Sequence, residues 1–261
     1  MPSTTVALLQ LQIEGDEPVA ERVARALEWA RREAQTADLV VLPELWHVGA
    51  FDIAAAREHA EPLDGPLVAA MADVARDTST WLHGGSFSEL AADGRHHNTS
   101  VVFAPDGTLA ALYRKVHLFG FTGGETTLMS AGTELVTLET PLGTTGLATC
   151  YDLRFPELFR GLVDAGATAV VMGSGWPATR IDHWSTLVRA RAIENQTLVI
   201  ACNEVGRHAG TDLGGRSAIV DATGRVLAEG GVGEEVVRAE IDLEVTSRWR
   251  EAFPVLADRR L

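Results

Sequence analysis

The stretch Thr144-Thr-Gly-Leu-Ala-Thr-Cys150-Tyr-Asp-Leu-Arg-Phe-Pro-Glu157 predicts a short buried strand, a turn at Cys150 and a helix that begins near Pro156. Proline is favoured in the first turn of a helix, and a glutamate there suits the positive helix end. A side chain at such a corner lies at the tip of a sheet, where layered α/β proteins usually bind ligands. The helix N-terminus can also lower the pKa of a thiol. Isolated cysteines are more often buried and structural, so the role of Cys150 depends on the rest of the chain.

The composition is that of a folded protein of moderate size. The 261 residues are 46% hydrophobic, which is enough for one large α/β domain with a sizeable core. No linker, low-complexity segment or short-period repeat interrupts the sequence, so we expect a single domain over residues 1–261.

The charge of the chain disfavours several classes of partner. Lys and Arg number 22 and Asp and Glu number 36, so the formal net charge is −14. A protein this acidic is repelled by phosphate backbones and anionic lipids, and we expect neither nucleic-acid nor membrane binding. No apolar run is long enough to span a bilayer, and no secretion signal is recognised. Two cysteines in this context are typical of reduced thiols, so we expect a cytoplasmic protein.

Lys115 is the single lysine among the 22 basic residues. The chain therefore uses arginine wherever a generic surface cation suffices. Chance in an Arg-rich composition is one explanation. The other is that position 115 requires an ammonium group, whose compact charge and adjustable pKa a guanidinium cannot reproduce.

Apolar runs alternate with amphipathic segments along the chain, and they predict strands and helices respectively. The expected strands cover residues 4–13, 37–44, 81–87, 98–104, 108–116, 135–138, 144–149, 168–173, 197–203 and 235–243, with a hairpin over 217–227. The expected helices cover residues 18–36, 65–78, 155–166 and 183–196. Residues 117–134 are rich in Gly and Thr and predict a long loop, a feature that is commonly functional.

Glu44 ends the second predicted strand and is a candidate acid–base residue. A carboxylate at a strand end is normally solvated, but Leu45, Trp46 and Phe51 follow closely. A carboxylate in apolar surroundings is a suitable proton carrier near neutral pH.

No metal or cofactor motif is recognised. The eight histidines include no His-x-x-x-His pair, and His96-His97 falls in a predicted polar turn. We therefore expect neither a metal nor a cofactor. Cys202 lies mid-strand among Val, Ile and Ala and is interpreted as structural.

Three blocks of the sequence resemble the nitrilase, or carbon–nitrogen hydrolase, superfamily. They are Val-Val-Leu-Pro-Glu44, Tyr-Arg-Lys115-Val-His-Leu-Phe and Cys150-Tyr-Asp-Leu-Arg-Phe-Pro-Glu, in this order. The similarity continues through Trp176-Pro177 and the run 190–196, so it covers nearly the whole chain. The resemblance implies an α+β fold, a four-layer α-β-β-α sandwich, and a homodimer or higher homo-oligomer. In the dimer the sheets continue across subunits.

The resemblance also implies a mechanism. Amide hydrolysis needs a nucleophile, a proton carrier and a donor for the oxyanion. On the family pattern Cys150 attacks the amide carbon and Glu44 carries the proton. Lys115 and the backbone N–H of Tyr151 hold the oxyanion, and the family's second glutamate corresponds to Glu125, which would position Lys115 or the substrate.

The neighbouring residues narrow the substrate class. The run after Cys150 is similar to amidases rather than to true nitrilases, and the segment that begins at Trp176 is most similar to the omega-amidases. This likeness implies a small linear amide, a dicarboxylate monoamide such as α-ketoglutaramate, with Trp176 at the substrate pocket. Arg154 either grips the distal carboxylate of the substrate or pairs with a neighbouring carboxylate to fix the turn. Gly175 and Glu204 depart from the omega-amidase pattern near the expected pocket, where relatives often have Asn and Arg.

Two other functions fit the same residues. An N-carbamoyl amide hydrolase would use Glu44, Lys115, Glu125 and Cys150 with a different pocket. A non-catalytic interaction protein on this scaffold is disfavoured because all four residues are present. Ammonia release from a panel of small amides separates the three functions.

Overall fold

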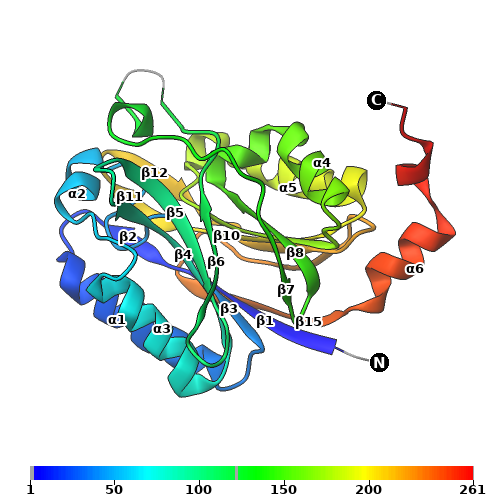
Figure 1. Ribbon diagram of the computed structural model, residues 1–261, viewed down its shortest axis with the longest axis horizontal. Helices are drawn as coiled ribbons and strands as arrows, with labels where there is room; N and C mark the ends of the chain where they lie inside the picture. The colour runs from blue at the N-terminus through cyan, green and yellow to red at the C-terminus, as the bar shows by residue number, and fades with distance from the viewer. Residues whose placement is uncertain (1–2, 121–122, 261) are drawn as a thin grey trace.

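The computed structural model describes residues 3–120 and 123–260. Two six-stranded sheets lie face to face, and helices cover the outer face of each (Figure 1). Helices α1 and α3 lie on one side and α4 and α5 on the other, which confirms the expected four-layer α-β-β-α sandwich. Within the described residues, no helix is long and apolar enough to cross a membrane.

The first sheet has the order β15-β1-β3-β4-β5-β6 and the second the order β14-β13-β10-β9-β8-β7. Strands of the first sheet are β1 (Ser3–Gln10), β3 (Leu39–Val41), β4 (Trp81–Leu90), β5 (His96–Phe103), β6 (Leu109–Arg114) and β15 (Glu235–Asp242). Strands of the second are β7 (Thr137–Thr140), β8 (Gly143–Thr149), β9 (Ala169–Ser174), β10 (Leu198–Asn203), β13 (Ala218–Val220) and β14 (Val226–Glu229). The helices are α1 (Val19–Ala34), α2 (Ile53–Glu58), α3 (Pro66–Thr78), α4 (Pro156–Asp164), α5 (Ile181–Asn195) and α6 (Glu244–Ala252).

The layers follow from the two-residue period of buried strands. In β1, Ala7 and Leu9 pack toward α1 and α3, whereas Leu8 packs between the two sheets. In β9, Met172 packs toward α4 and α5 and Val171 packs between the sheets. Because successive side chains point to opposite faces and both faces are covered, these strands read as continuous apolar runs.

The expected strand over residues 4–13 is wrong in its length, because the chain changes sheets at Leu11. β2 (Gln12–Glu14) leaves the first sheet and joins a small sheet with the order β12-β11-β2. The backbone N–H of Val205 donates to the carbonyl of Leu11, and Gln12 pairs with Val205 in register. Leu11 and Ile13 continue the alternating apolar pattern of the run, so the pattern alone does not mark the break.

Several short elements were not predicted. β11 (Val205–His208) and β12 (Thr211–Gly214) form a hairpin that turns at Ala209 and Gly210, both with positive φ. Helices α2 and α6 also lie outside the expected helices, and short 3₁₀ helices interrupt the loops. These are η1 (Glu125–Thr127), η2 (Cys150–Arg154), η3 (Ala178–Arg180) and η4 (Val255–Asp258). Elements this short have too little periodicity to distinguish them from loops.

The topology brings several strand ends to one edge of the sandwich. β1, β3 and β4 are parallel, and so are β8, β9 and β10. β6 runs antiparallel to β5, which is antiparallel to β4, so its carboxyl end lies at the same edge as that of β3. The two sheets approach closely there, since a Cβ on Gly173 would lie 2.8 Å from the carbonyl carbon of Pro43.

Candidate active site

Cys150 lies at the end of β8 and begins η2 in a left-handed conformation, with a φ of 45°. Few residues other than glycine adopt this conformation, which costs roughly 1–3 kcal/mol. A capping box compensates, in which Thr149 and Asp152 each bond the backbone of the other. The turn therefore holds the thiol of Cys150 at the sheet edge in one orientation.

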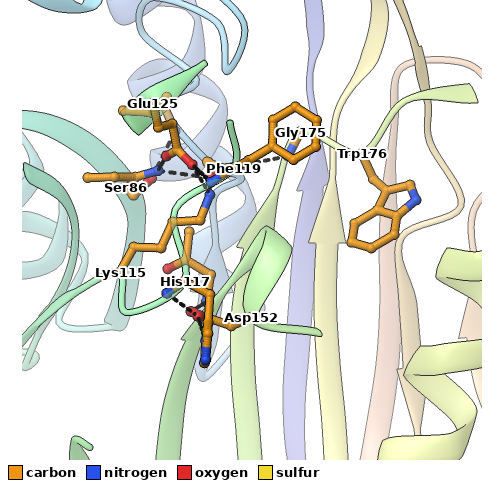
Figure 2. A network of polar contacts seen from close by, with 12 residues as sticks. Ser86, Lys115, His117, Phe119, Glu125, Asp152, Gly175 and Trp176 are labelled. Atoms are coloured by element: carbon orange, nitrogen blue, oxygen red, sulfur yellow. Dashed lines mark hydrogen bonds and ion pairs between the residues drawn. The ribbon is translucent and has the colours of Figure 1, made fainter. Parts of the chain in front are cut away.

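Asp152 joins this turn to the strand end that carries Lys115 (Figure 2). The Asp152 carboxylate accepts hydrogen bonds from Tyr113 Oη at 2.7 Å, from Thr149 N at 2.9 Å, and from His117 N and Nδ1 at 3.0 and 2.8 Å. Asp152 is fully buried, so these bonds lie in a medium of low dielectric constant. Because Tyr113 and His117 flank Lys115 in the chain, Asp152 links the position of the lysine to that of the nucleophile turn.

Lys115 lies between two buried carboxylates. Its Nζ is 2.7 Å from Glu44 Oε1 and 2.7 Å from Glu125 Oε2. Asn98 Nδ2 donates to the same pair of residues, to Glu44 Oε1 at 2.8 Å and to Glu125 Oε1 at 2.6 Å. The side chains of Glu44, Lys115 and Glu125 are each at most 3% exposed. Two donors thus hold two carboxylates together, where alone they would repel each other.

Backbone amides complete the coordination of both carboxylates. Gly175 N donates to Glu44 Oε2 at 3.0 Å, and Phe119 N donates to Glu125 Oε2 at 2.7 Å. The cluster is therefore supported from the first sheet, from the loop after Lys115 and from the end of β9. Figure 2 shows Lys115 extended toward Glu125, with Gly175 beyond them.

The electrostatics keep Lys115 charged and Cys150 protonated. Burial alone would lower the pKa of Lys115, but Glu125 and Glu44 outweigh it and raise that pKa well above its usual value. Burial raises the pKa of Glu125, and Lys115 offsets this only in part. Burial, followed by the charge of Glu44, raises the pKa of the Cys150 thiol well above its usual value. The expectation that a helix N-terminus lowers the pKa of Cys150 is therefore wrong, because desolvation and Glu44 dominate.

A pocket of about 290 Å³ opens onto this cluster. All seven residues predicted for the site line it: Glu44, Lys115, Glu125, Cys150, Tyr151, Arg154 and Trp176. Apolar side chains such as Phe51, Ile53 and Phe119 form much of the remaining wall. No group of His, Cys, Asp or Glu that could hold a metal is found among the residues that the structure describes.

Arg154 stacks on the pocket wall and makes no ion pair within the described chain. Its guanidinium carbon lies 4.7 Å from the ring centroid of Trp176 and 6.0 Å from that of Tyr151. Both terminal nitrogens lie 3.4 Å from His183 Nδ1. The neighbouring carboxylate of Asp152 accepts its hydrogen bonds from Tyr113, Thr149 and His117 instead. In residues 3–120 and 123–260, Arg154 therefore does not fix the turn by pairing with a carboxylate.

Gly175 and Glu204, the two departures from the family pattern, lie against each other. A Cβ on Gly175 would be 2.7 Å from Glu204 Oε2 and 2.4 Å from the Cβ of Ala50. Glu204 is fully buried, and neither carboxyl oxygen has a hydrogen-bond partner in the described residues. Burial and then the charge of Glu44 raise its pKa well above the usual value, which favours the neutral acid. Glu204 thus occupies the space that a side chain at position 175 would need.

Three contributions to the site were missed from the sequence. Asn98 is an isolated amide in a strand, and nothing in its neighbourhood marks it as a ligand of two carboxylates. Asp152 and His117 lie within two of the blocks that resemble the superfamily, but the two residues are 35 positions apart in the chain. The amide of Gly175 carries no side-chain signal at all, since its role depends on backbone position.

The chain is similar to known proteins in sequence and in fold. Residues 5–251 match the family model described as carbon–nitrogen hydrolase. The 2-oxoglutaramate amidase of Paenarthrobacter nicotinovorans is 44% identical, with 98% of this chain and 89% of that protein covered. Human omega-amidase NIT2 is 35% identical, with 100% of this chain and 96% of that protein covered. The crystal structure of Saccharomyces cerevisiae Nit3, a member of branch 10 of the nitrilase superfamily, has a TM-score of 0.89 at 33% identity, covering 100% of this chain and 97% of that one.

Proposed function

This chain belongs to the carbon–nitrogen hydrolase family, and we propose that it hydrolyses the terminal amide of a short dicarboxylate monoamide such as 2-oxoglutaramate, also called α-ketoglutaramate. One observation carries the proposal. Cys150 and the buried Glu44–Lys115–Glu125 cluster line the same pocket as the guanidinium of Arg154, which makes no ion pair within the described residues. The names of the relatives, 2-oxoglutaramate amidase and omega-amidase, support this substrate class.

In the first half-reaction Cys150 forms a thioester. Because its pKa is raised, the thiol carries its proton at rest and needs a general base as it attacks. Glu44 takes that proton while sulfur bonds to the amide carbon. The resulting oxyanion is held by Lys115 Nζ and by the backbone N–H of Tyr151. When the C–N bond breaks, Glu44 passes the proton to the leaving nitrogen, and ammonia departs.

In the second half-reaction water cleaves the thioester. Glu44, again a base after ammonia leaves, takes a proton from water as oxygen attacks the carbonyl carbon. Collapse of this second tetrahedral intermediate breaks the C–S bond. Cys150 regains its proton from Glu44, and the carboxylic acid product leaves. Glu125 takes no proton in this scheme, and its 2.7 Å contact orients Lys115.

Arg154 supplies the charge that the distal carboxylate requires. At a net charge of −14 the protein repels anions in general, so an anionic substrate needs a local cation. Within the described residues no carboxylate pairs with Arg154. Its terminal nitrogens make long contacts of 3.4 Å to His183 Nδ1, which a substrate carboxylate can replace by binding the fork bidentately. The apolar wall between the rim and Cys150 suits a short aliphatic chain.

We also propose a cytoplasmic homodimer. Both cysteines are unpaired and buried, as expected in a reducing compartment. The resemblance to the nitrilase superfamily implies the dimer, in which the sheets continue across subunits. Light scattering on purified protein should give twice the mass of the chain, and a monomer at micromolar concentration would contradict the dimer.

The decisive experiment measures product release from matched substrates. We expect rapid ammonia release from 2-oxoglutaramate and glutaramate, slower release from neutral pentanamide, and little conversion of a nitrile or an N-carbamoyl amine. Arg154→Met should lower kcat/KM for the carboxylated amides by about ten-fold or more, since a hydrogen-bonded charge contact is lost, and leave pentanamide nearly unchanged. If Arg154→Met lowered kcat/KM equally for all the amides, Arg154 would not bind the substrate carboxylate. Faster turnover of the nitrile or the N-carbamoyl amine than of the amides would overturn the proposed function.

A further inference from the structure

The pocket is electrically asymmetric from its inner end to its rim. Glu44, Lys115 and Glu125 meet at the inner end, two acids around one base. At the rim lie two arginines, Arg154 and Arg180, and the pocket has no other acid among its described lining residues. A neutral amide therefore suits the inner end, and an electron-rich tail suits the rim. Two cations are more than a single carboxylate needs.

Arg180 is held at the rim by its backbone, which leaves its side chain available. It is the last residue of η3 and precedes α5. Its carbonyl accepts a hydrogen bond from Trp176 Nε1 at 2.8 Å. Its half-buried guanidinium lies 5.7 Å from the ring centroid of Phe119 and makes no hydrogen bond or ion pair with any residue in 3–120 or 123–260. All five of its N–H donors are therefore unused within the described chain.

The same aromatic side chain connects the two arginines. The ring of Trp176 lies under the guanidinium of Arg154, while its indole N–H binds the backbone of Arg180. On the other wall, Phe119 lies under Arg180 and makes an edge contact with Tyr151 at 5.3 Å between centroids. The aromatic contacts therefore support both cations at the same rim. The donor edge of Arg180 is unused within the described chain, whereas that of Arg154 makes 3.4 Å contacts to His183 Nδ1.

We propose that Arg180 is a second substrate-binding residue and that it recognises an oxygen on the carbon next to the distal carboxylate. This inference rests on the proposed function. A plain carboxylate has two oxygens, which one guanidinium fork binds bidentately. A 2-oxo acid presents three acceptor oxygens in one plane, and the third oxygen needs a second donor. With Arg154 on the carboxylate, Arg180 serves the 2-oxo group, so the pocket distinguishes 2-oxo monoamides from plain monoamides.

The alternative role of Arg180 is to brace Phe119 against the pocket. The two roles predict different patterns across substrates. A brace acts on every substrate alike, since it fixes the wall and touches no substrate atom. A donor to the 2-oxo group affects only substrates that carry that oxygen, because a site built to hydrogen-bond a group discriminates against the analogue that lacks it.

The test compares 2-oxoglutaramate with glutaramate, which has the same chain without the 2-oxo group. The variants are Arg180→Met, Arg180→Lys and, as a matched control, Arg57→Met, which removes an exposed arginine outside the pocket. Arg180→Met should lower kcat/KM for 2-oxoglutaramate by about ten-fold or more and that for glutaramate by less than about three-fold. Arg180→Lys should recover part of this loss, and Arg57→Met should change neither substrate. Thermal unfolding of each variant confirms that it is folded.

A binding measurement separates this inference from the proposed function. In the Cys150→Ala background neither amide can form a thioester, so calorimetry measures binding alone. We expect 2-oxoglutaramate to bind about ten-fold more tightly than glutaramate, and Arg180→Met to abolish that difference. Equal losses on both amides, or an unchanged ratio of affinities, would overturn the role of Arg180. Binding with the expected ratio but without ammonia release from wild-type protein would instead overturn the proposed reaction and leave Arg180 as a ligand for 2-oxo acids.

Discussion

Replacing Lys115 with arginine keeps the buried charge and tests whether the site needs an ammonium. The side chain is 1% exposed and its Nζ lies 2.7 Å from each of two carboxylates. A guanidinium is larger, and overpacking a buried site costs roughly 1–3 kcal/mol. The rigid planar fork cannot pair with Glu44 and Glu125 and also place a donor at the oxyanion. Losing one such donor lowers kcat by about 10²–10³.

A second substitution separates charge from geometry. Lys115→Met removes the ammonium and leaves two carboxylates buried without their counter-ion, which costs about 3–5 kcal/mol of stability. We therefore expect the arginine variant to stay folded with a modestly lower melting temperature, and the methionine variant to unfold much earlier. Ammonia release measures kcat, and urea unfolding measures stability. If Lys115→Arg keeps more than about a tenth of wild-type turnover while folded, the assigned oxyanion role is wrong.

Three further predictions concern residues around the cluster. Asp152→Asn replaces an acceptor of four hydrogen bonds, so the turn at Cys150 should shift relative to Lys115. We expect kcat to fall about 10²-fold and KM to change little. Gly175→Ala places a Cβ 2.7 Å from Glu204 Oε2, which should displace the amide that holds the base and lower kcat by about ten-fold or more. Burial lowers the pKa of His83 to about 4. As the pH falls from about 6.5 to about 4, the unfolded chain binds this proton before the folded chain does. His83 alone should therefore lower the free energy of unfolding by about 1.4 kcal/mol for each pH unit of acidification in this range.

Each of these has a clear contrary result. Asp152→Asn would contradict the linking role if it changed only the melting temperature and left kcat intact. Gly175→Ala with normal kcat would show that the wall has room for a side chain. For the histidine, His83→Gln should make the fall in stability between about pH 7 and pH 5 less steep in urea unfolding, while the buried His47, whose pKa is lowered to about 3, keeps its own contribution. The same acid sensitivity in that variant would assign the effect to other groups.

Much of the fold and the site follows from local chemistry in the sequence. Strands such as β9 and β10 are buried on both faces, so their apolar runs are unambiguous. Glu44, Lys115 and Cys150 each stand at a strand end, and parallel strands bring such ends to one edge. Their convergence in one pocket is therefore predictable before any coordinates, and the family resemblance makes it specific.

The remaining features depend on contacts between distant segments. The pairing of β2 with β11 breaks the first apolar run, yet no residue in that run signals it. Asn98 contacts the carboxylates of Glu44 and Glu125, which are 54 and 27 positions away in the chain, and a lone amide in a strand carries no sign of this. The raised pKa of Cys150 also depends on distant segments. The position of Cys150 near a helix can be seen in the local sequence, whereas the charge of Glu44, which raises the pKa, comes from the other sheet.

The covalent role of Cys150 is the central claim, and intact-protein mass spectrometry tests it most directly. Glu44→Gln cannot activate water, so a thioester formed slowly from a monoamide substrate should accumulate on the enzyme. Peptide mapping should then place the acyl group on Cys150 and leave Cys202, which is fully buried, unmodified. The account predicts an adduct with the mass of the acyl group on Cys150 alone. An adduct on Cys202, or no adduct with a substrate that the wild-type enzyme hydrolyses, would contradict it.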